Sequence, residues 1–257
     1  YSGNRVEYDP RPAPATGFPT RTEQADLLFV THCAHGEFPR AVFAPGNAQE
    51  AFHSIRKAFY LAEKYQSPVF VLGDQALNDS SWTTEPFAMD DRFSGTQSLV
   101  SEQALKDLKP YAYARYEITD SGISPRLLPG TPGQVLYADS DEHTVEGHIT
   151  ESADVRRSMV EKRLRKLAGM REEIAGPRIF PGADAESYLV CWGSTLGAVE
   201  ETVLALRAEG ANWGYIHFSE LYPLPEVPIP REISQRARLI AVENNATGQF
   251  CKLLRME

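Results

Sequence analysis

The sequence predicts an α/β protein, and three observations support this fold class. Residues 41–74 contain a short apolar segment, "AVFAP", then an amphipathic segment, "GNAQEAFHSIRKAFYLAEKYQ", then a second apolar segment, "PVFVLGD". A strand, a helix and a strand within about thirty residues are typical of a βαβ unit with parallel strands. A similar alternation begins near residue 185. The chain has 257 residues, of which 42% are hydrophobic, enough for two modest α/β domains.

The first unit begins with a loop. The first twenty residues are rich in Pro and Gly, which disfavour a helix. A helix is expected to follow over "EQADLLFVTHCAH", with Thr20 or Thr22 as its N-cap and Glu23 in the capping-box position after Thr20. The periodicity weakens from residue 78 to residue 133. Within that region, "YAYARYEITDSGIS" is interpreted as a pair of strands.

A charged helical arm and a second α/β unit complete the chain. The arm is predicted over 151–174, with Thr150 or Ser152 as its N-cap. Its apolar side is expected to contain Val155, Met159, Val160, Leu164 and Leu167. The second unit is predicted as a strand at "SYLVCWG", a helix at "STLGAVEETVLALRAEG", a strand at "NWGYIHFSEL", a short helix at "PREISQRA", a strand at "RLIAVEN" and a helix at "NATGQFCKLLRM".

Charge and cysteine content exclude several classes of protein. The formal net charge of −9 argues against nucleic acid or an anionic membrane as the main partner. No apolar run reaches the roughly 18 residues of a membrane span, and the N-terminus does not resemble a signal peptide. Cys33, Cys191 and Cys251 are far apart, which disfavours a disulfide framework, a zinc ribbon or an iron–sulfur cluster held by this chain alone. We therefore expect a soluble cytoplasmic protein.

One acidic stretch has the composition of a metal site. "YADSDEHTVEGHITE" places four acids and two histidines within ten residues, and both residue types bind divalent metals. The spacing fits neither the H-E-x-x-H motif nor a calcium loop. The alternative, which we favour, is a solvated connector before the helical arm, with Asp141, Glu142 and His143 in polar contacts to the arm or to a partner. The residues are Asp139, Asp141, Glu142, His143, Glu146 and His148.

The loop "RPAPATGFPTRTEQ" is a candidate binding site. Arg11 lies in a proline-rich loop before the predicted helix. An arginine held in this way can bind a carboxylate with two parallel hydrogen bonds, and backbone N–H groups at the helix start could assist. The alternative is a turn with a surface arginine.

Two strand–helix turns in the second unit are further candidates. Glu243, Asn244 and Asn245 follow an apolar strand, at the edge of a parallel sheet where ligands bind, and Gly248 permits close approach of the backbone. A tight turn or a subunit contact explains them equally well. In "CWGSTLG", Ser194 is expected to cap the next helix. Because the G-x-S-x-G elbow is missing, it is not expected to be a nucleophile.

Seven stretches together resemble the α subunit of the 2-oxoacid:ferredoxin oxidoreductases, most closely the 2-oxoglutarate type. They occur in the family's order and cover nearly the whole chain from Arg11 onward. The block from Tyr188 to Arg255 also resembles the C-terminal domain of transketolase-type enzymes. The stretches are "RPAPATGFPTRTEQADLLF", "HGEFPRAVFAPGNAQEAF", "GISPRLLPG", "YADSDEHTVEGHITE", "VRRSMVEKRLRKL", "CWGSTLGAVEE" and "AVENNATGQF".

The resemblance implies an activity, its cofactors and its partners. Such enzymes oxidatively decarboxylate a 2-oxoacid with coenzyme A and pass the electrons to ferredoxin, with thiamine diphosphate as cofactor. A β subunit, in an (αβ)2 assembly, is expected to supply the diphosphate and Mg²⁺ site and a [4Fe–4S] cluster. The resemblance gives a substrate-binding role to Arg11, Thr16 and Gly17. It assigns no catalytic residue and no metal ligand in this chain.

The resemblance also divides the chain. Residues 1–136 correspond to the remainder of a pyrimidine-binding domain, 137–181 to the connector and arm, and 182–257 to a transketolase C-terminal-like domain. Family α chains begin with a further half-domain that contains a "YPITPSSE"-like stretch and the glutamate that binds the thiamine pyrimidine. This sequence contains no such stretch, so we expect a part of an α subunit that is active only with the rest of that chain and a β subunit.

Two alternatives stay open. The first keeps the chemistry and changes the substrate to pyruvate, a branched-chain or an aryl 2-oxoacid. The second is a non-catalytic assembly module with a transketolase-like fold.

Overall fold

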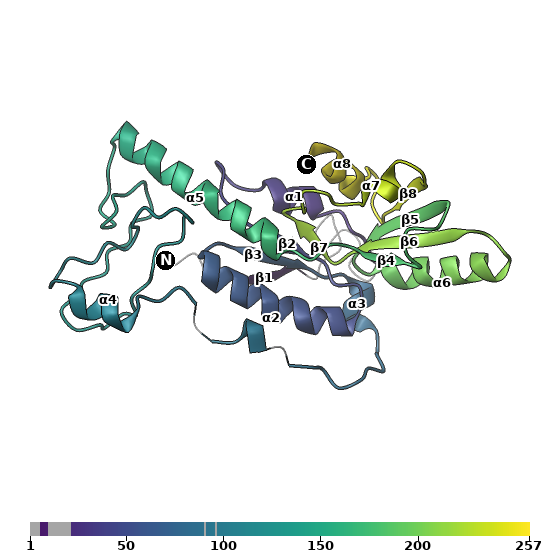
Figure 1. Cartoon of the computed structure of the whole chain (residues 1–257), viewed down its shortest axis with the longest axis horizontal. Coiled ribbons are helices and arrows are strands. Elements are labelled where there is room, and N and C mark those ends of the chain that lie inside the picture. The colour runs from purple at the N-terminus through teal and green to yellow at the C-terminus, as the bar shows by residue number, and fades with distance from the viewer. Residues whose placement is uncertain (1–5, 10–21, 90, 96) are drawn as a thin grey trace.

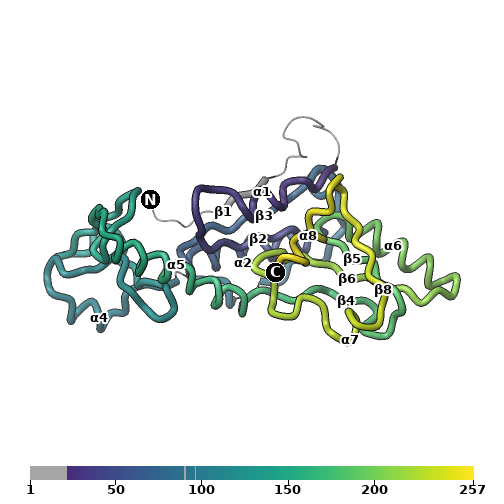
Figure 2. Tube along the Cα trace, turned by 90° about the horizontal axis from the view of Figure 1, so that it is seen from above, coloured from purple at the N-terminus to yellow at the C-terminus, as the bar shows by residue number. Residues whose placement is uncertain are grey.

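The protein contains two four-stranded sheets with helices packed against them (Figure 1). The computed structural model describes residues 6–9, 22–89, 91–95 and 97–257. Figure 2 shows an elongated molecule, with the region around α4 at one end and the second sheet at the other. The predicted α/β class is confirmed. The predicted domain boundaries stay a prediction.

The first sheet has the strand order β1-β3-β2-β7. Its strands are β1 (Val6–Asp9), β2 (Ala41–Phe43), β3 (Val69–Leu72) and β7 (Glu220–Tyr222). Strand β3 is parallel to both β1 and β2, and β7 is antiparallel to β2. Helix α2 (Ala48–Tyr65) connects β2 to β3, so the βαβ unit predicted from the sequence is confirmed.

Local capping interactions mark both ends of helix α2. The Asn47 side chain accepts a hydrogen bond from the N–H of Glu50, and the Glu50 carboxylate accepts one from the N–H of Gly46, 2.7 Å away. This reciprocal pair satisfies N–H groups that have no partner within the helix. At the other end, Gln66 adopts a left-handed conformation, with φ 50°, and terminates the helix.

The second sheet has the strand order β4-β6-β5-β8. Its strands are β4 (Arg178–Phe180), β5 (Ser187–Trp192), β6 (Trp213–Phe218) and β8 (Arg238–Val242). Strand β5 is parallel to β6 and β8, and β4 is antiparallel to β6. The helices of this unit are α6 (Thr195–Ala208), α7 (Arg231–Ser234) and α8 (Gln249–Met256), as the sequence predicts.

The single strand predicted over 212–221 divides between the two sheets. The break lies at Ser219, whose carbonyl accepts a hydrogen bond from the N–H of Ala44, 2.8 Å away. The Glu220 carboxylate binds the Lys57 ammonium on α2 at 2.8 Å. These contacts hold β7 against the first sheet. One apolar core consequently includes Val42 and Leu72 of the first sheet and Trp192 and Phe218 of the second.

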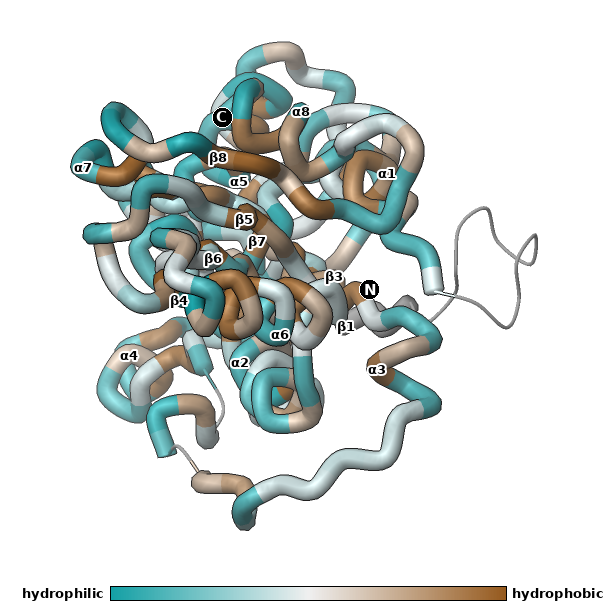
Figure 3. The backbone as a smooth tube through the Cα atoms, turned by 90° about the vertical axis from the view of Figure 1, so that its right-hand side faces the viewer, coloured by the Kyte–Doolittle hydropathy of each residue, from teal (hydrophilic) through white to brown (hydrophobic). Residues whose placement is uncertain are grey.

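Helix α1 (Leu27–His32) is shorter than predicted. Thr20, one of the two predicted caps, lies outside the described residues, and Thr22 is not a cap, because the helix begins five residues later. Residues 22–26 are not helical, because Thr22, Gln24 and Ala25 make hydrogen bonds to the first residue of α8 and to the segment before it instead. Figure 3 shows hydrophobic stretches along α1 and β8.

Few regular elements occur between residues 75 and 152. They are α3 (Gln75–Asp79), the 3-10 helix η1 (Asp91–Phe93) and α4 (Glu102–Asp107). The strand pair predicted over 111–124 is wrong, since this segment, which is fully described, forms no strand. Side chains fix its course: the Tyr113 hydroxyl donates to the Pro125 carbonyl at 2.9 Å and accepts from the N–H of Leu127 at 3.1 Å.

The predicted arm is helix α5 (Ala153–Glu173), capped by the Ser152 side chain as expected. Its buried side differs from the predicted apolar side. Met159 is buried, but Leu164 is 40% exposed, and the other buried side chains of the helix are Lys162, Lys166 and Met170. Within the described residues, no helix is both long and apolar enough to cross a membrane.

Candidate functional site

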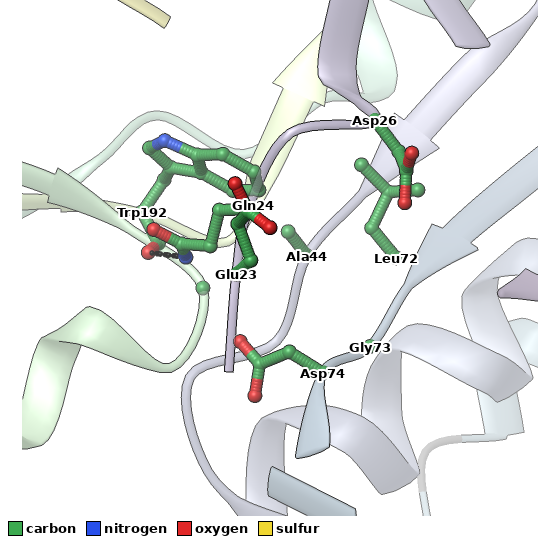
Figure 4. A pocket seen from close by; sticks show the side chains of 9 residues that line it. Glu23, Gln24, Asp26, Ala44, Leu72, Gly73, Asp74 and Trp192 are labelled. Atoms are coloured by element: carbon green, nitrogen blue, oxygen red, sulfur yellow. Dashed lines mark hydrogen bonds between the residues drawn. The ribbon is translucent and has the colours of Figure 1, made fainter. Parts of the chain in front are cut away.

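Strands of both sheets end around a common cleft, which Figure 4 shows in close-up. Ala44 follows β2, Gly73 and Asp74 follow β3, and Gly193 follows β5. In parallel α/β sheets, ligands bind at these carboxyl ends of the strands. The described residues that line the cleft are Glu23, Gln24, Asp26, Ala44, Leu72, Gly73, Asp74, Trp192 and Gly193.

The turns after β2 and β5 touch each other. A Cβ atom at Gly46 would lie 2.8 Å from the Gly193 carbonyl oxygen and 2.9 Å from Nε2 of His217, too close for any larger residue. His217 is buried and bonds the Gly193 carbonyl through Nε2 at 3.2 Å. Burial lowers the pKa of His217, so the imidazole is neutral near pH 7. The two sheet edges are therefore held in a fixed relation.

Gln24, the last residue of the loop "RPAPATGFPTRTEQ" (the arginine loop), connects the end of this loop to the second sheet. Its side chain is 4% exposed, donates to the Trp192 carbonyl at 2.9 Å and accepts from the N–H of Asn244 at 3.1 Å. Its backbone N–H donates to the Asn244 carbonyl at 2.8 Å. A buried amide whose polar atoms are all paired fixes the backbone around it. The segment at Gln24 is thus held at the ends of β5 and β8.

Ser194 has a different partner from the expected one. It occupies the N-cap of α6 without a side-chain capping bond, and its hydroxyl instead donates to the Asp74 carboxylate. The other Asp74 oxygen accepts from the N–H of Leu77 at 3.0 Å. Asp74 therefore joins the edge of the first sheet to the turn after β5.

Glu243 anchors α8. Its carboxylate accepts hydrogen bonds from the N–H groups of Phe250 at 2.7 Å and Cys251 at 2.9 Å, and from the Asn245 side chain at 2.9 Å. A carboxylate at a helix N-terminus is stabilised by the unpaired N–H groups and the helix dipole. These contacts support the tight-turn interpretation of "VENNATGQF".

The same turn holds the end of the arginine loop and the residues that follow it. The Asn245 side chain donates to the Gln24 carbonyl at 3.2 Å. Gln249 donates to the Ala25 carbonyl at 2.7 Å and accepts from the N–H of Leu28 at 2.9 Å. The turn before α8 therefore positions residues 22–28. Arg11, Thr16 and Gly17 themselves lie outside the described residues, so their role stays a prediction.

The described lining of the cleft is acidic. Carboxylates of Glu23, Asp26 and Asp74 line it, and it contains about 20 Å³ of space. That volume accommodates about one water-sized group. The described lining contains no cationic side chain and therefore does not suit a diphosphate or a substrate carboxylate.

A family model described as "Pyruvate flavodoxin/ferredoxin oxidoreductase, thiamine diP-bdg" matches residues 7–162. This match covers more than half of the chain. The chain belongs to this oxidoreductase family.

Individual relatives of the family agree with this assignment. The chain is 35% identical, over 98% of its length, to the 2-oxoacid:ferredoxin oxidoreductase subunit alpha of Saccharolobus solfataricus. It is 30% identical, over 95% of its length, to the 2-oxoglutarate oxidoreductase subunit KorA of Mycobacterium tuberculosis. It spans 39% and 36% of these two relatives.

A solved structure of the same family matches the whole chain. It is the 2-oxoglutarate:ferredoxin oxidoreductase from Magnetococcus marinus with 2-oxoglutarate, coenzyme A and succinyl-CoA bound. The TM-score is 0.85 at 29% identity, and the match covers 100% of this chain and 44% of that one.

The acidic stretch joins a loop of this oxidoreductase chain to α5. The Glu142 carboxylate accepts hydrogen bonds from Arg156 at 2.7 Å and from Arg163 at 2.8 Å and 3.1 Å. Burial alone would raise the pKa of Glu142, but the hydrogen bonds from both arginines lower it to about 2. The His143 ring stacks on Tyr116 with centroids 3.7 Å apart. The prediction of polar contacts that fix the arm is confirmed for Glu142, whereas Asp141 bonds Asp139 and His143 bonds the Thr144 carbonyl instead.

The alternative of a metal site in this stretch has no geometric support. Among the described residues, which include all of 137–151, no group of three or more His, Cys, Asp or Glu side chains could hold a metal ion. Asp141 uses its N–H to bond the Asp139 carboxylate at 3.0 Å, and Glu146 accepts from Thr144 at 2.8 Å. The acids of the stretch are thus used in local contacts.

The family implies thiamine diphosphate, and the described residues that line the cleft do not fit its diphosphate. A diphosphate needs cations, a metal ion or free backbone N–H groups. The cleft in Figure 4 contains carboxylates instead.

Sequence reasoning missed three residues of the sheet edge, namely Gln24, Asp74 and His217. Two signals could have found Asp74: it follows a predicted buried strand and lies directly after a glycine. Gln24 and His217 carry no such local signal, because each acquires its partners from segments more than twenty residues away.

Proposed function

We propose that the chain is part of the α subunit of a 2-oxoacid:ferredoxin oxidoreductase. The complete enzyme would convert a 2-oxoacid and coenzyme A to an acyl-CoA and carbon dioxide and pass two electrons to ferredoxin. The observation that carries this proposal is the match of the whole chain, with a TM-score of 0.85, to a solved 2-oxoglutarate:ferredoxin oxidoreductase. We propose 2-oxoglutarate as the substrate and succinyl-CoA as the product.

A β subunit would supply the parts of the active site that the described residues do not provide. We propose that it contributes the diphosphate and Mg²⁺ site and a [4Fe–4S] cluster, in a cytoplasmic (αβ)2 assembly. Bound thiamine diphosphate supplies the group that stabilises the carbanion left by decarboxylation. One cysteine of this chain, Cys191, supports this division, because it is buried and burial raises the pKa of its thiol to about 12. Light scattering of the co-purified subunits tests the assembly.

Arg11 would bind the carboxylate of the 2-oxoacid. The support is indirect: Gln24, Asn245 and Gln249 fix the end of the loop and the residues that follow it. In the complete enzyme, Arg11→Ala is expected to raise KM for the 2-oxoacid about 100-fold, because charge-assisted hydrogen bonds each contribute roughly 1.5–3 kcal/mol.

The control for this experiment is Arg231→Ala, which removes an exposed arginine on α7. Thiamine diphosphate affinity, measured by calorimetry, should be unchanged in both variants. Unchanged kinetics for Arg11→Ala would disprove the role of Arg11 while leaving the family assignment intact.

The choice of 2-oxoglutarate has its own test. Reduction of ferredoxin is measured with 2-oxoglutarate, pyruvate, a branched-chain and an aryl 2-oxoacid, each with coenzyme A, and kcat/KM values are compared. We expect 2-oxoglutarate to be preferred. A preference for another 2-oxoacid would retain the chemistry and replace the substrate.

A non-catalytic assembly module is the second candidate. The lining of the cleft, which offers a diphosphate no cation, is compatible with this candidate and equally with the enzyme, in which the β subunit would supply the diphosphate site. Calorimetry of the complete assembly with thiamine diphosphate and Mg²⁺ separates the two proposals. Saturable heat together with turnover supports the enzyme, and heat absent at saturating cofactor supports the module.

A further inference from the structure

A second cavity lies between α5 and two loops, away from the sheet edges. Its volume is about 120 Å³, well above the roughly 10–15 Å³ that a single water needs. Its walls come from the end of α2, from the loop at 115–116, from the acidic stretch and from α5. The principal wall residues are Gln66, Arg115, Tyr116, His143, Lys162 and Lys166.

Two lysines in this wall are buried without a carboxylate partner. Lys162 is 4% exposed and Lys166 is 8% exposed. The Lys162 ammonium donates to the Ser124 hydroxyl at 2.5 Å, and the Lys166 ammonium reaches the Gln66 carbonyl at 3.4 Å. Among the described residues, neither lysine forms an ion pair. Glu142, the carboxylate of the adjoining acidic stretch, is bound by Arg156 and Arg163.

Other cations surround these two lysines. Arg115 donates to the Gln66 side chain at 2.9 Å and lies over the Tyr116 ring, 4.8 Å from its centroid. Burial and then the charges of Lys166, Arg115, Arg163 and Arg165 lower the pKa of Lys162 to about 7. Burial and the charges of Arg115 and Arg163 lower the pKa of Lys166 to about 8. Buried charges of one sign are costly unless a counter-charge is present.

We propose that this cavity binds an oxyanion of the phosphate class, with Lys162, Lys166 and Arg115 as its donors. An anion in the cavity would supply the missing counter-charge and would accept hydrogen bonds that the lysines do not make within the chain. The cavity has room for one tetrahedral group. The anion could be free phosphate or a terminal phosphate of a larger ligand. The proposal is independent of the activity proposed above.

Direct binding measurements test this site in the full chain. Inorganic phosphate and sulfate are titrated by calorimetry and in thermal unfolding, with chloride keeping the ionic strength constant. We expect saturable binding with one site per chain and a rise in Tm beyond the chloride control. Equal Tm values in phosphate and chloride, without measurable heat, would overturn the proposal and would indicate that an acidic partner or nothing occupies the cavity.

Variants locate the binding. Lys166→Met retains most of the apolar side chain and removes the charge, and Arg115→Ala removes the charge of a half-buried loop residue. Each should weaken phosphate binding at least 10-fold. Lys109→Met, which removes an exposed charge, should bind like the unchanged chain. If both cavity variants bind phosphate normally, the lysines only connect α5 to Ser124 and Gln66, and the site lies elsewhere.

Dependence on pH gives a second readout. Sulfate is used because it stays a dianion across the range. The groups that face the lysines are Arg115, Tyr116, His143, Arg163 and Arg165. Burial lowers the pKa of His143 below its ordinary value, so His143 loses its charge at lower pH than the lysines. Raising the pH from 6 to 9 removes the charges of Lys162 and Lys166. Sulfate binding should weaken by about 10-fold over that interval, and a flat profile would contradict the assignment of the lysines as donors.

Competition distinguishes the two sources of the anion. Coenzyme A and its 3′-dephospho form are titrated in the presence and absence of saturating phosphate. If coenzyme A displaces phosphate and its 3′-dephospho form does not, the cavity would be assigned to the terminal phosphate of a larger ligand. Binding of phosphate without any such displacement would assign it to the free anion, and both results support an oxyanion site.

Discussion

Helix α5 contacts two charged clusters that are built in opposite ways. At the first, Glu142 from the acidic stretch lies between Arg156 and Arg163, so that two cations on the helix share one half-buried carboxylate. At the second, Lys162 and Lys166 on the same helix face Arg115 from another loop, and the described residues contribute no carboxylate. The first cluster therefore holds the acidic stretch against α5, whereas the second cluster lacks a counter-charge among the described residues.

The comparison shows that charge alone does not identify a binding site. The acidic stretch has the composition of a metal site, yet Glu142 is used within the protein and its pKa is lowered to about 2 by its arginines. The lysines belong to a helix that looks like an ordinary charged arm in the sequence. Their burial without an anionic partner is what marks the second cluster as a candidate site.

The largest effect is expected at the contact between the loop before Ser124 and the lysine cluster. Gly122 has φ +76°, and a Cβ atom there would collide with the Lys162 carbonyl oxygen. Gly122→Ala should lower the free energy of unfolding by about 3 kcal/mol, from backbone strain together with the clash. The measurement is urea denaturation followed by circular dichroism.

Gly130→Ala is the matched control for this clash. Gly130 has φ +89°, and a Cβ atom added there would meet no atom within 4 Å beyond its chain neighbours, so this variant contains the strain without the collision. It should cost about 1 kcal/mol. Equal losses in the two variants would show that the loop moves away and that the cluster is less rigidly packed than the structure indicates.

An intermediate effect is expected at the paired cluster. The pKa of Glu142 is about 2 in the fold, below its ordinary value of 4.5 in the unfolded chain, so the ionised form stabilises the fold above about pH 4.5. That stability is lost as the pH falls through 2. At pH 7, Glu142→Gln should lower the free energy of unfolding by about 2 kcal/mol.

The pH profile distinguishes this ion pair from a packing effect. Chemical denaturation is repeated at pH 7, 4 and 3, with the exposed Glu151→Gln as the control. The loss for Glu142→Gln should shrink steadily with falling pH. A loss of constant size at every pH would mean that shape, rather than charge, holds the acidic stretch to the arm.

The smallest effect, and one of opposite sign, is expected at the unpaired cluster. Because the pKa of Lys166 is lowered to about 8 in the fold, its charged form opposes folding below that pH, and the opposition disappears as the pH rises toward 10.5, its ordinary value. Lys166→Met should therefore raise the free energy of unfolding by about 1 kcal/mol at pH 7 in anion-free buffer.

Two further conditions sharpen this last prediction. At pH 10 the gain from Lys166→Met should be nearly zero, and saturating phosphate should reverse its sign by stabilising the unchanged chain more than the variant. The exposed Lys109→Met should show neither behaviour. Destabilisation by Lys166→Met at pH 7 would mean that the bond to the Gln66 carbonyl outweighs the cost of the buried charge.

Much of the fold follows from local sequence patterns. The strand, helix and strand over 41–72, the capped arm and the alternating elements after 187 are confirmed because their signals are local: apolar runs, helical periodicity and capping residues. Two wrong element predictions also have physical causes. Helix α1 begins late because residues 22–26 bond to a turn more than 200 positions away, and the strand over 212–221 divides because Glu220 pairs with Lys57.

For the candidate sites, too, local sequence patterns predict some features and only the tertiary structure gives the others. The sequence by itself determined the α/β class and the resemblance to an oxidoreductase α subunit, because each depends on patterns that are local within short stretches of the chain. Only the tertiary structure decided the partners of Gln24, Asp74 and Glu142 and the burial of Lys162 and Lys166. A charge is paired or unpaired according to its neighbours in space, and those neighbours come from distant segments that no local pattern specifies.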